Sequence, residues 1–562
     1  MNISVKEWFK SGSPWVWMNA GAVAISLIMV VGLLGLIAVR GLSHFWPADV
    51  VQGVYTLDGQ PRTLAGEIVE SNEVLTKQLI EAGMKLPEEN EFSTRHLLKI
   101  GNRDVYGSDF AWALEHYFTE QHRPEMLLVA ERREWGNLYG YLRSIKESGT
   151  EVARYDGNDK SAQYLALWDN LQQRIQRALE IHEDILEIEK HEIGTINYEL
   201  ERLRLKERGL QLKEVKEQSL YDAITQRRKE LDADYEGLQQ RLIDLYSEIN
   251  RDSMTVEVAG GKIVDVQLAK LVRIFRPNDM NVGQKIVHYF AKLWEFVSDD
   301  PREANTEGGI FPAIFGTVMM VLLMSLLVTP FGVIAAVYLR EYAKQGFVTR
   351  LIRIAVNNLA GVPSIVYGVF GLGFFVYFLG GNIDDLFFAA AKPSPTFGTP
   401  GLLWASLTLA LLTVPVVIVA TEEGLSRIPR AVREGSLALG ATKFETLMKV
   451  VLPMASPAMM TGVILAIARA AGEVAPLMLV GVVKLAPSLP LDGNYPFIHL
   501  DQKFMHLGFH IYDVGFQSPN VEAARPLVYA TALLLVLVIA LLNMSAIAIR
   551  NHLREKYKAL EM

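Results

Sequence analysis

The chain has 562 residues, half of them apolar, and a mean hydropathy of +0.18, a mixture typical of membrane spans joined to a polar block. It has no cysteine, which excludes disulfides and thiolate metal sites. Residues 41–309 hold 34 Lys/Arg against 48 Asp/Glu, a balance of −14, whereas the remainder holds 21 against 15, a balance of +6. No basic footprint stands out, so we expect no nucleic-acid partner.

The first predicted membrane span is Val16–Val39, an uncharged run long enough to cross a hydrocarbon core. Lys6 and Lys10 precede it, as in a signal peptide, but the run exceeds a typical signal-peptide core and no small-residue cleavage site follows. We therefore expect residues 1–40 to form the N-terminus and an uncleaved span. The further predicted spans are Ile310–Leu339, Gly361–Leu379, Leu402–Ala420, Pro457–Val482 and Leu527–Ile549.

The loop charges predict how these six spans are oriented. Fifteen Lys/Arg fall in the segments that would be cytoplasmic if the N-terminus is inside, which are 1–15, 339–354, 421–453 and 550–562. Only four fall in the short loops of the other side, 380–400 and 483–525. The positive-inside rule therefore places both termini in the cytoplasm and residues 41–309 outside it, in the periplasm of a bacterial inner membrane.

The block 41–309 is predicted to be an α+β insertion. Val50–Leu57 and Leu97–Tyr106 favour strands, whereas Ala111–Phe118 and Leu138–Lys146 favour helices. Thr255–Phe275 again favours strands, and an amphipathic helix that lies at the membrane surface is expected just before the second span.

A long charged stretch inside the block, about residues 164–250, has apolar residues at heptad spacing. We expect it to form a helical hairpin with coiled-coil packing, and the alternative is a solvated helix packed along the domain. One seam comprises Leu171, Ile175, Ala178, His182 and Ile185. The other comprises Ile224, Leu231, Tyr235, Leu238, Leu242, Leu245 and Ile249.

The segment 421–453 is the most informative part of residues 310–562, the predicted five-helix core. From Arg430 to Pro453 it favours a short helix of small residues, a glycine that ends it, a second short helix and a proline that opens a span. Small side chains let the backbone of another protein approach closely. The residues expected to form this docking loop are Arg433, Glu434, Gly435, Ser436, Ala438, Gly440, Ala441, Thr442 and Pro453.

These residues resemble those of the importer-type permeases of ABC transporters. That family has Glu-Ala-Ala, then Gly after three residues and Ile-x-Leu-Pro after nine more. The matching positions here are Glu434, Gly440, Val450, Leu452 and Pro453. Gly435-Ser436 replaces the two alanines, and both are small, although Gly435 costs about 1 kcal/mol of helix propensity. The resemblance implies that the loop forms a coupling helix on a separate ATPase subunit.

Two further motifs resemble phosphate permeases in particular. They are Gly361–Gly368, which reads GVPSIVYG, and Ala466–Leu477, which reads AIARAAGEVAPL. The order of spans favours the PstA type over its PstC-type partner, although Val474 stands where the family often has threonine. The likeness covers about residues 310–562 and the first span, and the long insertion resembles that of a proteobacterial subgroup.

The resemblance implies an all-α membrane domain that forms a pathway for inorganic phosphate with a homologous, PstC-like permease in the lipid of the inner membrane. A PstB-like ATPase dimer would bind both permeases, and a PstS-like periplasmic protein would deliver phosphate. No Gly-x-x-x-x-Gly-Lys-Ser/Thr occurs in the chain, so another chain must handle the nucleotide. We expect neither catalytic residues nor a cofactor.

Arg469 is the candidate for contact with the transported anion. It would lie about twelve residues into the fifth span, where a charge is costly unless it faces protein or water, and its guanidinium suits phosphate oxygens. Glu473 would lie one turn later on the same face and could hold the arginine when no anion is present. The alternative is a structural ion pair. Ser364 and Tyr367 are weaker pathway candidates, for which helix packing is the other role.

The histidines give no metal motif. His116 and His122 are six residues apart, and His506 and His510 lack the glutamate that a zinc-protease motif needs between them. Three other functions are alternatives: a permease for sulfate, molybdate or phosphonate, a coiled-coil membrane sensor, and a secondary transporter. A sensor would place its signalling helix in the cytoplasm, and a secondary transporter would show inverted repeats.

Overall fold

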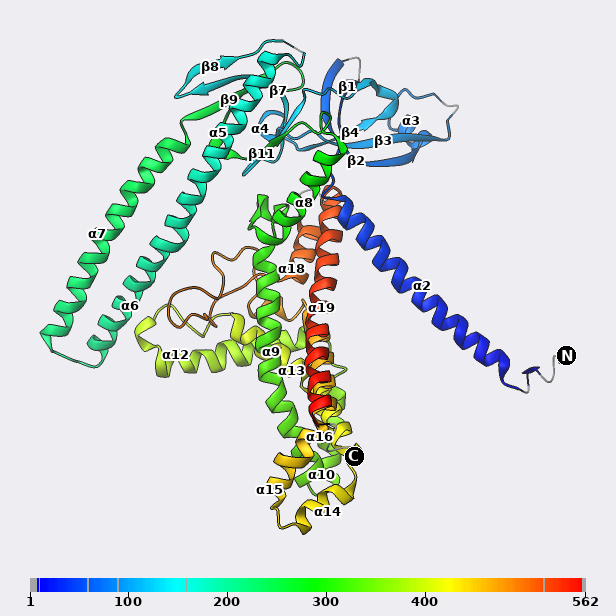
Figure 1. Ribbon diagram of the computed structural model, residues 1–562, viewed down its shortest axis with the longest axis vertical. Coiled ribbons are helices and arrows are strands. Elements are labelled where there is room, and N and C mark those ends of the chain that lie inside the picture. The colour runs from blue at the N-terminus through cyan, green and yellow to red at the C-terminus, as the bar shows by residue number, and fades with distance from the viewer. Residues whose placement is uncertain are drawn as a thin grey trace.

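The computed structural model describes residues 8–9, 11–57, 60–87, 90–157, 159–518 and 521–557, so Lys6 and Lys10 lie outside the described residues. A bundle of long helices forms the axis of the molecule, and a β-rich unit sits on one of its ends (Figure 1). The opposite end carries the segment 421–453. We call these the insertion end and the loop end of the bundle.

Six helical stretches of the described chain are long and apolar enough to cross a membrane, as the sequence predicts. They are Ser13–Ser43 (α2), Phe311–Tyr342 (α9 Phe311–Val337 and η5 Tyr338–Tyr342), Ser364–Phe387 (α11 Ser364–Phe370, η6 Gly371–Gly380 and α12 Gly381–Phe387), Leu402–Arg427 (α13), Lys443–Ala471 (α15 Lys443–Thr446, η8 Leu447–Val451 and α16 Leu452–Ala471) and Ala524–Glu555, within α19 (Val521–Tyr557).

The predicted bounds of the fifth span, Pro457–Val482, are wrong. The helical stretch begins at Lys443 and ends at Ala471, so Glu473 lies beyond the helix. Gly472 caps α16, and Pro476, which has no backbone N–H to donate, begins a separate short helix, α17 (Leu477–Val480). A hydropathy pattern continues through such a break because the residues on both sides of it are apolar.

α13 is the central helix of the bundle and packs between α9 and α16. Glycines allow these close approaches: an added methyl group at Gly424 would lie 2.5 Å from Ala458, and one at Gly462 would lie 2.7 Å from Ala420. α2 is different, because no residue of its most apolar stretch is buried among the described residues, and its end packs on α19, at Gly41 against Ala530. The exposed apolar surface of α2 therefore suits lipid.

The β-rich unit consists of two antiparallel sheets. The first has the order β4-β3-β2-β1-β5, with β1 at Val50–Leu57, β2 at Gln60–Leu75, β3 at Phe92–Lys99, β4 at Phe110–Leu114 and β5 at Phe118–His122. The second has the order β10-β9-β7-β6-β11, with β6 at Leu128–Arg132, β7 at Leu138–Glu147, β9 at Asp252–Glu257, β10 at Ile263–Gln267 and β11 at Leu271–Phe275, and β8 (Thr150–Arg154) pairs with β7.

The helices predicted at Ala111–Phe118 and Leu138–Lys146 are therefore wrong, since both segments are mainly strands. β7 pairs with β9, more than a hundred residues later in the chain. Such pairing, rather than local preference, decides the conformation of a short apolar run. The strand prediction for Val50–Leu57 is confirmed, and so is the β-rich prediction for Thr255–Phe275.

A pair of long antiparallel helical segments leaves the second sheet and runs beside the membrane helices (Figure 1). We call α5 (Ala162–Glu187), η2 (Ile188–Glu192), α6 (Ile193–Leu212) and α7 (Gln218–Ile249) the helical arm. The earlier predicted seam, including Leu171 and Ile175, belongs to a core that contains residues of the second sheet as well as Leu242, Leu245 and Ile249 of α7. In the later seam Tyr235 is exposed. The insertion is thus mixed helix and sheet, and the coiled coil stays a prediction.

The expected amphipathic helix before the second span is confirmed as α8 (Val282–Ser298), which opens with a capping box between Asn281 and Gln284. Phe296 is buried against Phe45, at the end of the first span, whereas Phe290 and Trp294 are exposed. A short hairpin, β12 (Pro301–Arg302) and β13 (Glu307–Gly308), then leads into α9.

Candidate coupling loop and intramembrane arginine

The segment 421–453 folds as two short helices joined by a tight turn. α14 (Arg430–Ala438) is followed by Gly440, whose φ of +88° ends the helix in the left-handed region that favours glycine. Thr442 then caps α15: its Oγ1 accepts from the Glu445 N–H at 3.2 Å, and a Glu445 carboxylate oxygen accepts from the Thr442 N–H at 3.0 Å. The turn is therefore specified by its own sequence.

Arg433 fastens α14 to the bundle. Its guanidinium donates to the backbone carbonyls of Ile428 at 2.7 Å and Leu425 at 2.8 Å, both at the end of α13. It also donates to a carboxylate oxygen of Glu341 at 2.9 Å, in η5. Arg433 thus joins the loop to two spans at once and supports the loop, rather than forming its free surface.

Other loop residues predicted from the sequence divide between two roles. Glu434, Gly435, Ala438 and Gly440 are exposed and form the free surface together with Thr442. Ser436 is partly buried because its hydroxyl lies 2.9 Å from that of Thr446, and Ala441 is also partly buried. Pro453 lies in the first turn of α16, so it belongs to the span rather than to the free surface.

Sequence reasoning missed two large apolar side chains on the free surface, Leu439 and Phe444, which are 91% and 64% exposed. The signal was present, because large apolar residues in a charged loop have no membrane to enter. It also missed Lys443, whose ammonium donates to the Glu341 carbonyl at 2.6 Å and lies 4.4 Å from the centre of the Tyr342 ring. The exposed apolar pair on a rigid turn is a surface suited to another protein.

Arg469 lies in the last turn of α16, and the packing of α16 on α13 fixes its depth. The close pairs Gly424–Ala458 and Gly462–Ala420 define an antiparallel register that puts Arg469 level with Thr413. Thr413 is eleven residues into α13, so Arg469 lies about 17 Å along that helix from its insertion end. This is close to the middle of α13.

Arg469 and Glu473 come together as the sequence predicts, although not on one helix. Arg469 Nε lies 3.8 Å from Glu473 Oε1, and the two side chains are 31% and 22% exposed, respectively. The break after Ala471 leaves Glu473 in the turn that leads to α17, where its N–H donates to the Ala470 carbonyl. A long, partly exposed ion pair next to a helix break can open to admit an anion between its members.

Ser364 and Tyr367 lie on α11, which packs against the segment after the break, since a methyl group at Gly368 would lie 2.7 Å from Pro476. The two motifs that resemble phosphate permeases therefore meet in space. Tyr367 is buried and its hydroxyl donates to the Leu359 carbonyl at 2.6 Å, which is a packing role, while Ser364 is partly exposed.

No three His, Cys, Asp or Glu side chains of the described residues are grouped as metal ligands. His506 and His510 are buried where α18 (Leu507–Tyr512) packs on α19. His506 Nδ1 accepts the Gly508 N–H at 3.1 Å, and His510 Nδ1 lies 3.4 Å from the hydroxyl of Thr531. Both imidazoles are used in packing.

Comparison with known proteins gives the family. Residues 328–559 match the family described as "Binding-protein-dependent transport system inner membrane component". The chain is 35% identical over 247 residues to phosphate transport system permease protein PstA 1 of Mycobacterium tuberculosis, covering 43% of this chain and 71% of that protein. It is 32% identical over 194 residues to the probable ABC transporter permease YqgH of Bacillus subtilis, covering 34% of this chain and 59% of that protein.

Among solved structures, the inward-facing MetNI methionine ABC transporter matches 43% of this chain and 94% of the other, at 19% identity and a TM-score of 0.32. The sequence relatives are the firmer guide. The matched residues hold the coupling loop, Arg469 and most of the bundle, whereas the β-rich insertion lies outside them. The chain therefore belongs to the PstA-type permeases, multi-pass inner-membrane components of binding-protein-dependent ABC transporters.

Proposed function

We propose that this chain is one of two permease subunits of an ATP-driven phosphate importer. The observation that carries the proposal is the rigid, exposed turn of the segment 421–453, which stands at the end of the bundle opposite the insertion. Its free surface can bind another protein, and Arg433 connects it to two spans. These two features suit a segment that transmits a movement of the bound protein to the membrane helices. The 35% identity to a phosphate permease supports phosphate as the cargo.

In this proposal the insertion faces the periplasm and the loop end faces the cytoplasm. The fifteen-to-four distribution of Lys/Arg supports this orientation. The insertion and the segment 421–453 lie at opposite ends of the bundle, which supports their placement on opposite sides of the membrane (Figure 1).

Arg469 is the proposed contact for phosphate inside the membrane. Three features support the role: its depth near the middle of α13, its partial exposure, and a carboxylate partner 3.8 Å away that phosphate oxygens could replace. A guanidinium offers phosphate two parallel N–H donors. Ser364 is the second proposed pathway residue, and Tyr367 contributes by holding α11 in place.

The partners in this proposal are a homologous PstC-like permease, a PstB-like ATPase dimer and a PstS-like binding protein. ATP-driven closure of the ATPases would move the coupling loop and switch the pathway between its two openings. The chain itself supplies no nucleotide site in this scheme, and hydrolysis is the work of the partner.

The test is to purify the full chain with its native partners, identify them by mass spectrometry and reconstitute the complex with its binding protein. ATP hydrolysis is followed as ADP formation, because added phosphate would mask phosphate release. We expect phosphate to stimulate hydrolysis several-fold and sulfate, molybdate and phosphonate to leave it unchanged.

Two different results would contradict the two parts of the proposal separately. Stimulation by one of the other oxyanions would leave the permease role and remove phosphate as the cargo. A chain that purifies without an ATPase, and whose membranes take up no oxyanion in an ATP-dependent way, would remove the permease role itself.

A further inference from the structure

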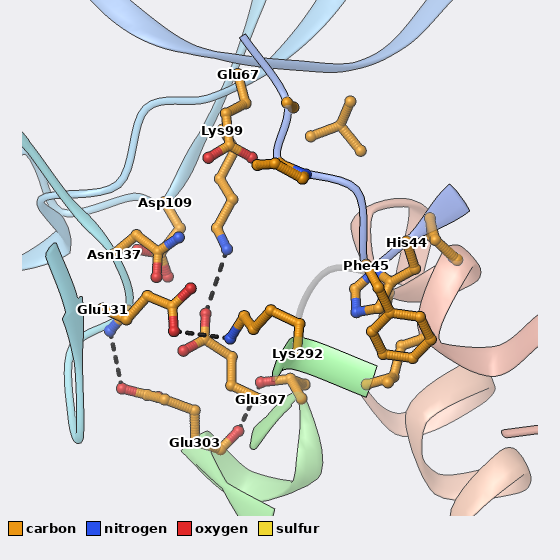
Figure 2. Close-up of a pocket in the computed structure, with 18 of the residues that line it drawn as sticks. His44, Phe45, Glu67, Lys99, Asp109, Glu131, Asn137, Lys292, Glu303 and Glu307 are labelled. Carbon is orange, nitrogen blue, oxygen red and sulfur yellow. Dashed lines mark hydrogen bonds and ion pairs between the residues drawn. The ribbon is translucent and has the colours of Figure 1, made fainter. Parts of the chain in front are cut away.

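A cavity of about 410 Å³ lies where the insertion meets the membrane helices, remote from the coupling loop and from Arg469. Its walls come from the end of α2, from β2, β3 and β6, from α8, from the β12–β13 hairpin and from the first turns of the α19 span. Figure 2 shows Glu67 and Lys99 entering from the strands and His44 and Phe45 facing them from beside the helices.

The charged lining is nearly, but not fully, neutralised. Among the lining residues that the structure describes, the carboxylates are Glu67, Asp109, Glu131, Glu295, Glu303 and Glu307, and the cations are Lys99, Arg103, Lys292 and Arg302. Arg273 reaches Glu295 at 3.1 Å from behind the wall and adds a fifth cation against six carboxylates. The wall therefore holds one carboxylate more than it has cations.

The cations are already engaged with carboxylates. Lys99 lies 3.2 Å from Glu307, Lys292 lies 2.7 Å from Glu131, and Arg103 lies 3.2 Å from Glu303. Burial lowers the pKa of Lys99, but Glu307 and Glu67 outweigh this effect and raise it to about 12. Burial raises the pKa of Glu131, but Lys292 and Arg273 bring it down to about 2. These pairs are charged at neutral pH and offer little to an anion.

Glu67 and Asp109 are the two carboxylates of the wall that are only partly paired with cations or hydrogen-bond donors. Glu67 accepts from the Tyr139 hydroxyl at 2.9 Å and has no basic group within ion-pair distance in the described chain. Burial raises its pKa. Asp109 lies 3.4 Å from Arg103 but shares that arginine with Glu303, and its other oxygen, Oδ1, is buried without a hydrogen-bond donor among the described residues. Two carboxylates therefore lack part of their compensation beside an open space.

The rest of the wall suits an organic cation. Phe45 and Phe296 pack with their ring centres 5.0 Å apart, and Trp46 and Phe275 also line the space. Aromatic faces attract a partly desolvated ammonium group. His44 and His288 add no competing charge, because burial lowers the pKa of each to about 4.

The cavity also lies at the edge of the membrane. Ser43, which lines it, ends the first span, and Ala524 and Leu527, which also line it, are in the first turn of the last span. Lipid headgroups occupy this depth in a bilayer. A headgroup amine could reach the cavity from the adjoining leaflet, and a free amine could reach it from water.

We propose that this cavity binds one primary ammonium group, with Glu67 and Asp109 as its counter-charges. The ammonium is supplied either by an ethanolamine lipid headgroup or by a free alkylamine. The site is independent of the transported anion. It would hold the insertion to the ends of α2 and α19 by completing the charge balance at their junction.

The test uses the purified full chain. Native mass spectrometry measures retention of phosphatidylethanolamine against phosphatidylglycerol, and isothermal titration with ethanolamine measures binding of the free amine, with ethylene glycol as the neutral control. The variants are Glu67→Gln and Asp109→Asn. The matched control is Glu73→Gln, which changes an exposed carboxylate on the same strand.

We expect the parent and Glu73→Gln to bind the amine or the amine lipid, and Glu67→Gln to lose at least tenfold in affinity. Retention of the lipid without binding of ethanolamine would identify the lipid as the source, and the reverse would identify the free amine. Affinity should fall as the pH is lowered, because a protonated Glu67 has no charge to offer. Glu67→Gln is expected to fold, because the amide oxygen can still accept from the Tyr139 hydroxyl. Asp109→Asn is the second variant that tests the proposal if Glu67→Gln does not fold.

The proposal is overturned if the parent binds neither amine, or if both variants bind as well as the parent. Equal binding of ethylene glycol would also overturn it, because the ammonium would then be irrelevant.

Discussion

Arg469 is the residue at which the proposed chemistry can be tested by substitution. Arg469→Gln removes both the charge and the paired N–H donors, while Arg469→Lys keeps only the charge. Hydrogen bonds to charged groups contribute about 1.5–3 kcal/mol each. We therefore expect the rate of phosphate uptake by the Arg469→Gln variant to fall at least ~10-fold, and that of the Arg469→Lys variant to lie between this rate and the parent rate. Uptake of labelled phosphate into vesicles is the measurement, with membrane level and complex assembly checked in parallel.

If Arg469→Gln transports like the parent, or fails only because the complex falls apart, the pair with Glu473 is structural. Arg350→Gln is the control, because Arg350 is an exposed arginine of α10 (Phe347–Leu359) outside the spans.

Arg433 tests the tie between the coupling loop and the bundle. Arg433→Ala removes donors to Leu425, Ile428 and Glu341 and leaves a partly buried carboxylate unpaired. We expect a destabilisation of about 2–3 kcal/mol at the loop and a several-fold loss of transport-coupled ATP hydrolysis, with insertion into the membrane unchanged. Arg430→Ala, an exposed position on the same short helix, should behave like the parent. If Arg433→Ala and Arg430→Ala hydrolyse ATP at equal rates, the contacts of Arg433 do not contribute to coupling.

At the scale of the element, the turn after α14 depends on Gly440. Its φ of +88° is a conformation that side chains with a Cβ rarely adopt, so substitution strains the turn although nothing lies within 4 Å of the added atom. Gly440→Leu also adds bulk to the free surface. We expect the variant to insert normally and to lose coupling between ATP hydrolysis and uptake. The measurement is the ratio of phosphate transported to ATP hydrolysed.

Gly435→Ala is the matched control for Gly440→Leu, because Gly435 has ordinary helical geometry and an alanine there should stabilise the helix by about 1 kcal/mol. A Gly440→Leu protein that keeps the parent ratio would show that the turn is not the part that engages the ATPase.

At the scale of the whole molecule, the proposed orientation makes a prediction about each end of the bundle. Alkaline phosphatase is active only outside the cytoplasm, so a fusion near Gly157 should be active and a fusion near Gly440 inactive. The charge asymmetry of the loops is the physical reason. Activity from the Gly440 fusion alone would reverse the topology, and comparable expression of both fusions is the control.

The sequence predicted well those features that depend on local patterns. Five spans, the turn at Gly440 and the second short helix after it follow from hydropathy and from residues a few positions apart. Predictions failed where distant residues decide. β7 was expected to be a helix because its pairing with β9 is invisible to local periodicity, and the fifth span was extended too far because apolar residues continue beyond the break at Gly472.

The candidate site divides in the same way. The approach of Glu473 to Arg469 was foreseen from their spacing, although the helix break changes how it is achieved. The roles of three loop residues depend on how the loop folds against α13 and η5, and so could not be predicted. Arg433 connects the loop to the spans, and Leu439 and Phe444 form the free surface. The charged cavity could not be found from sequence, because its walls come from many short segments spread between Ser43 and Leu527.

The helical arm has a mechanical consequence. From Ala162 to Tyr198 the chain is helical without interruption, a length of about 54 Å at 1.5 Å per residue. The start of this rod packs on the second β-sheet. At its other end, Tyr198 contacts His499, which lies in the loop between the fifth and sixth spans, with the two ring centres 6.0 Å apart. A rod held at two distant points acts as a strut, so a displacement of that loop is transmitted to the sheet rather than absorbed by flexible chain. The π-helical turn at η2 lies between the two supports, and it is the place where such a strut would bend under load.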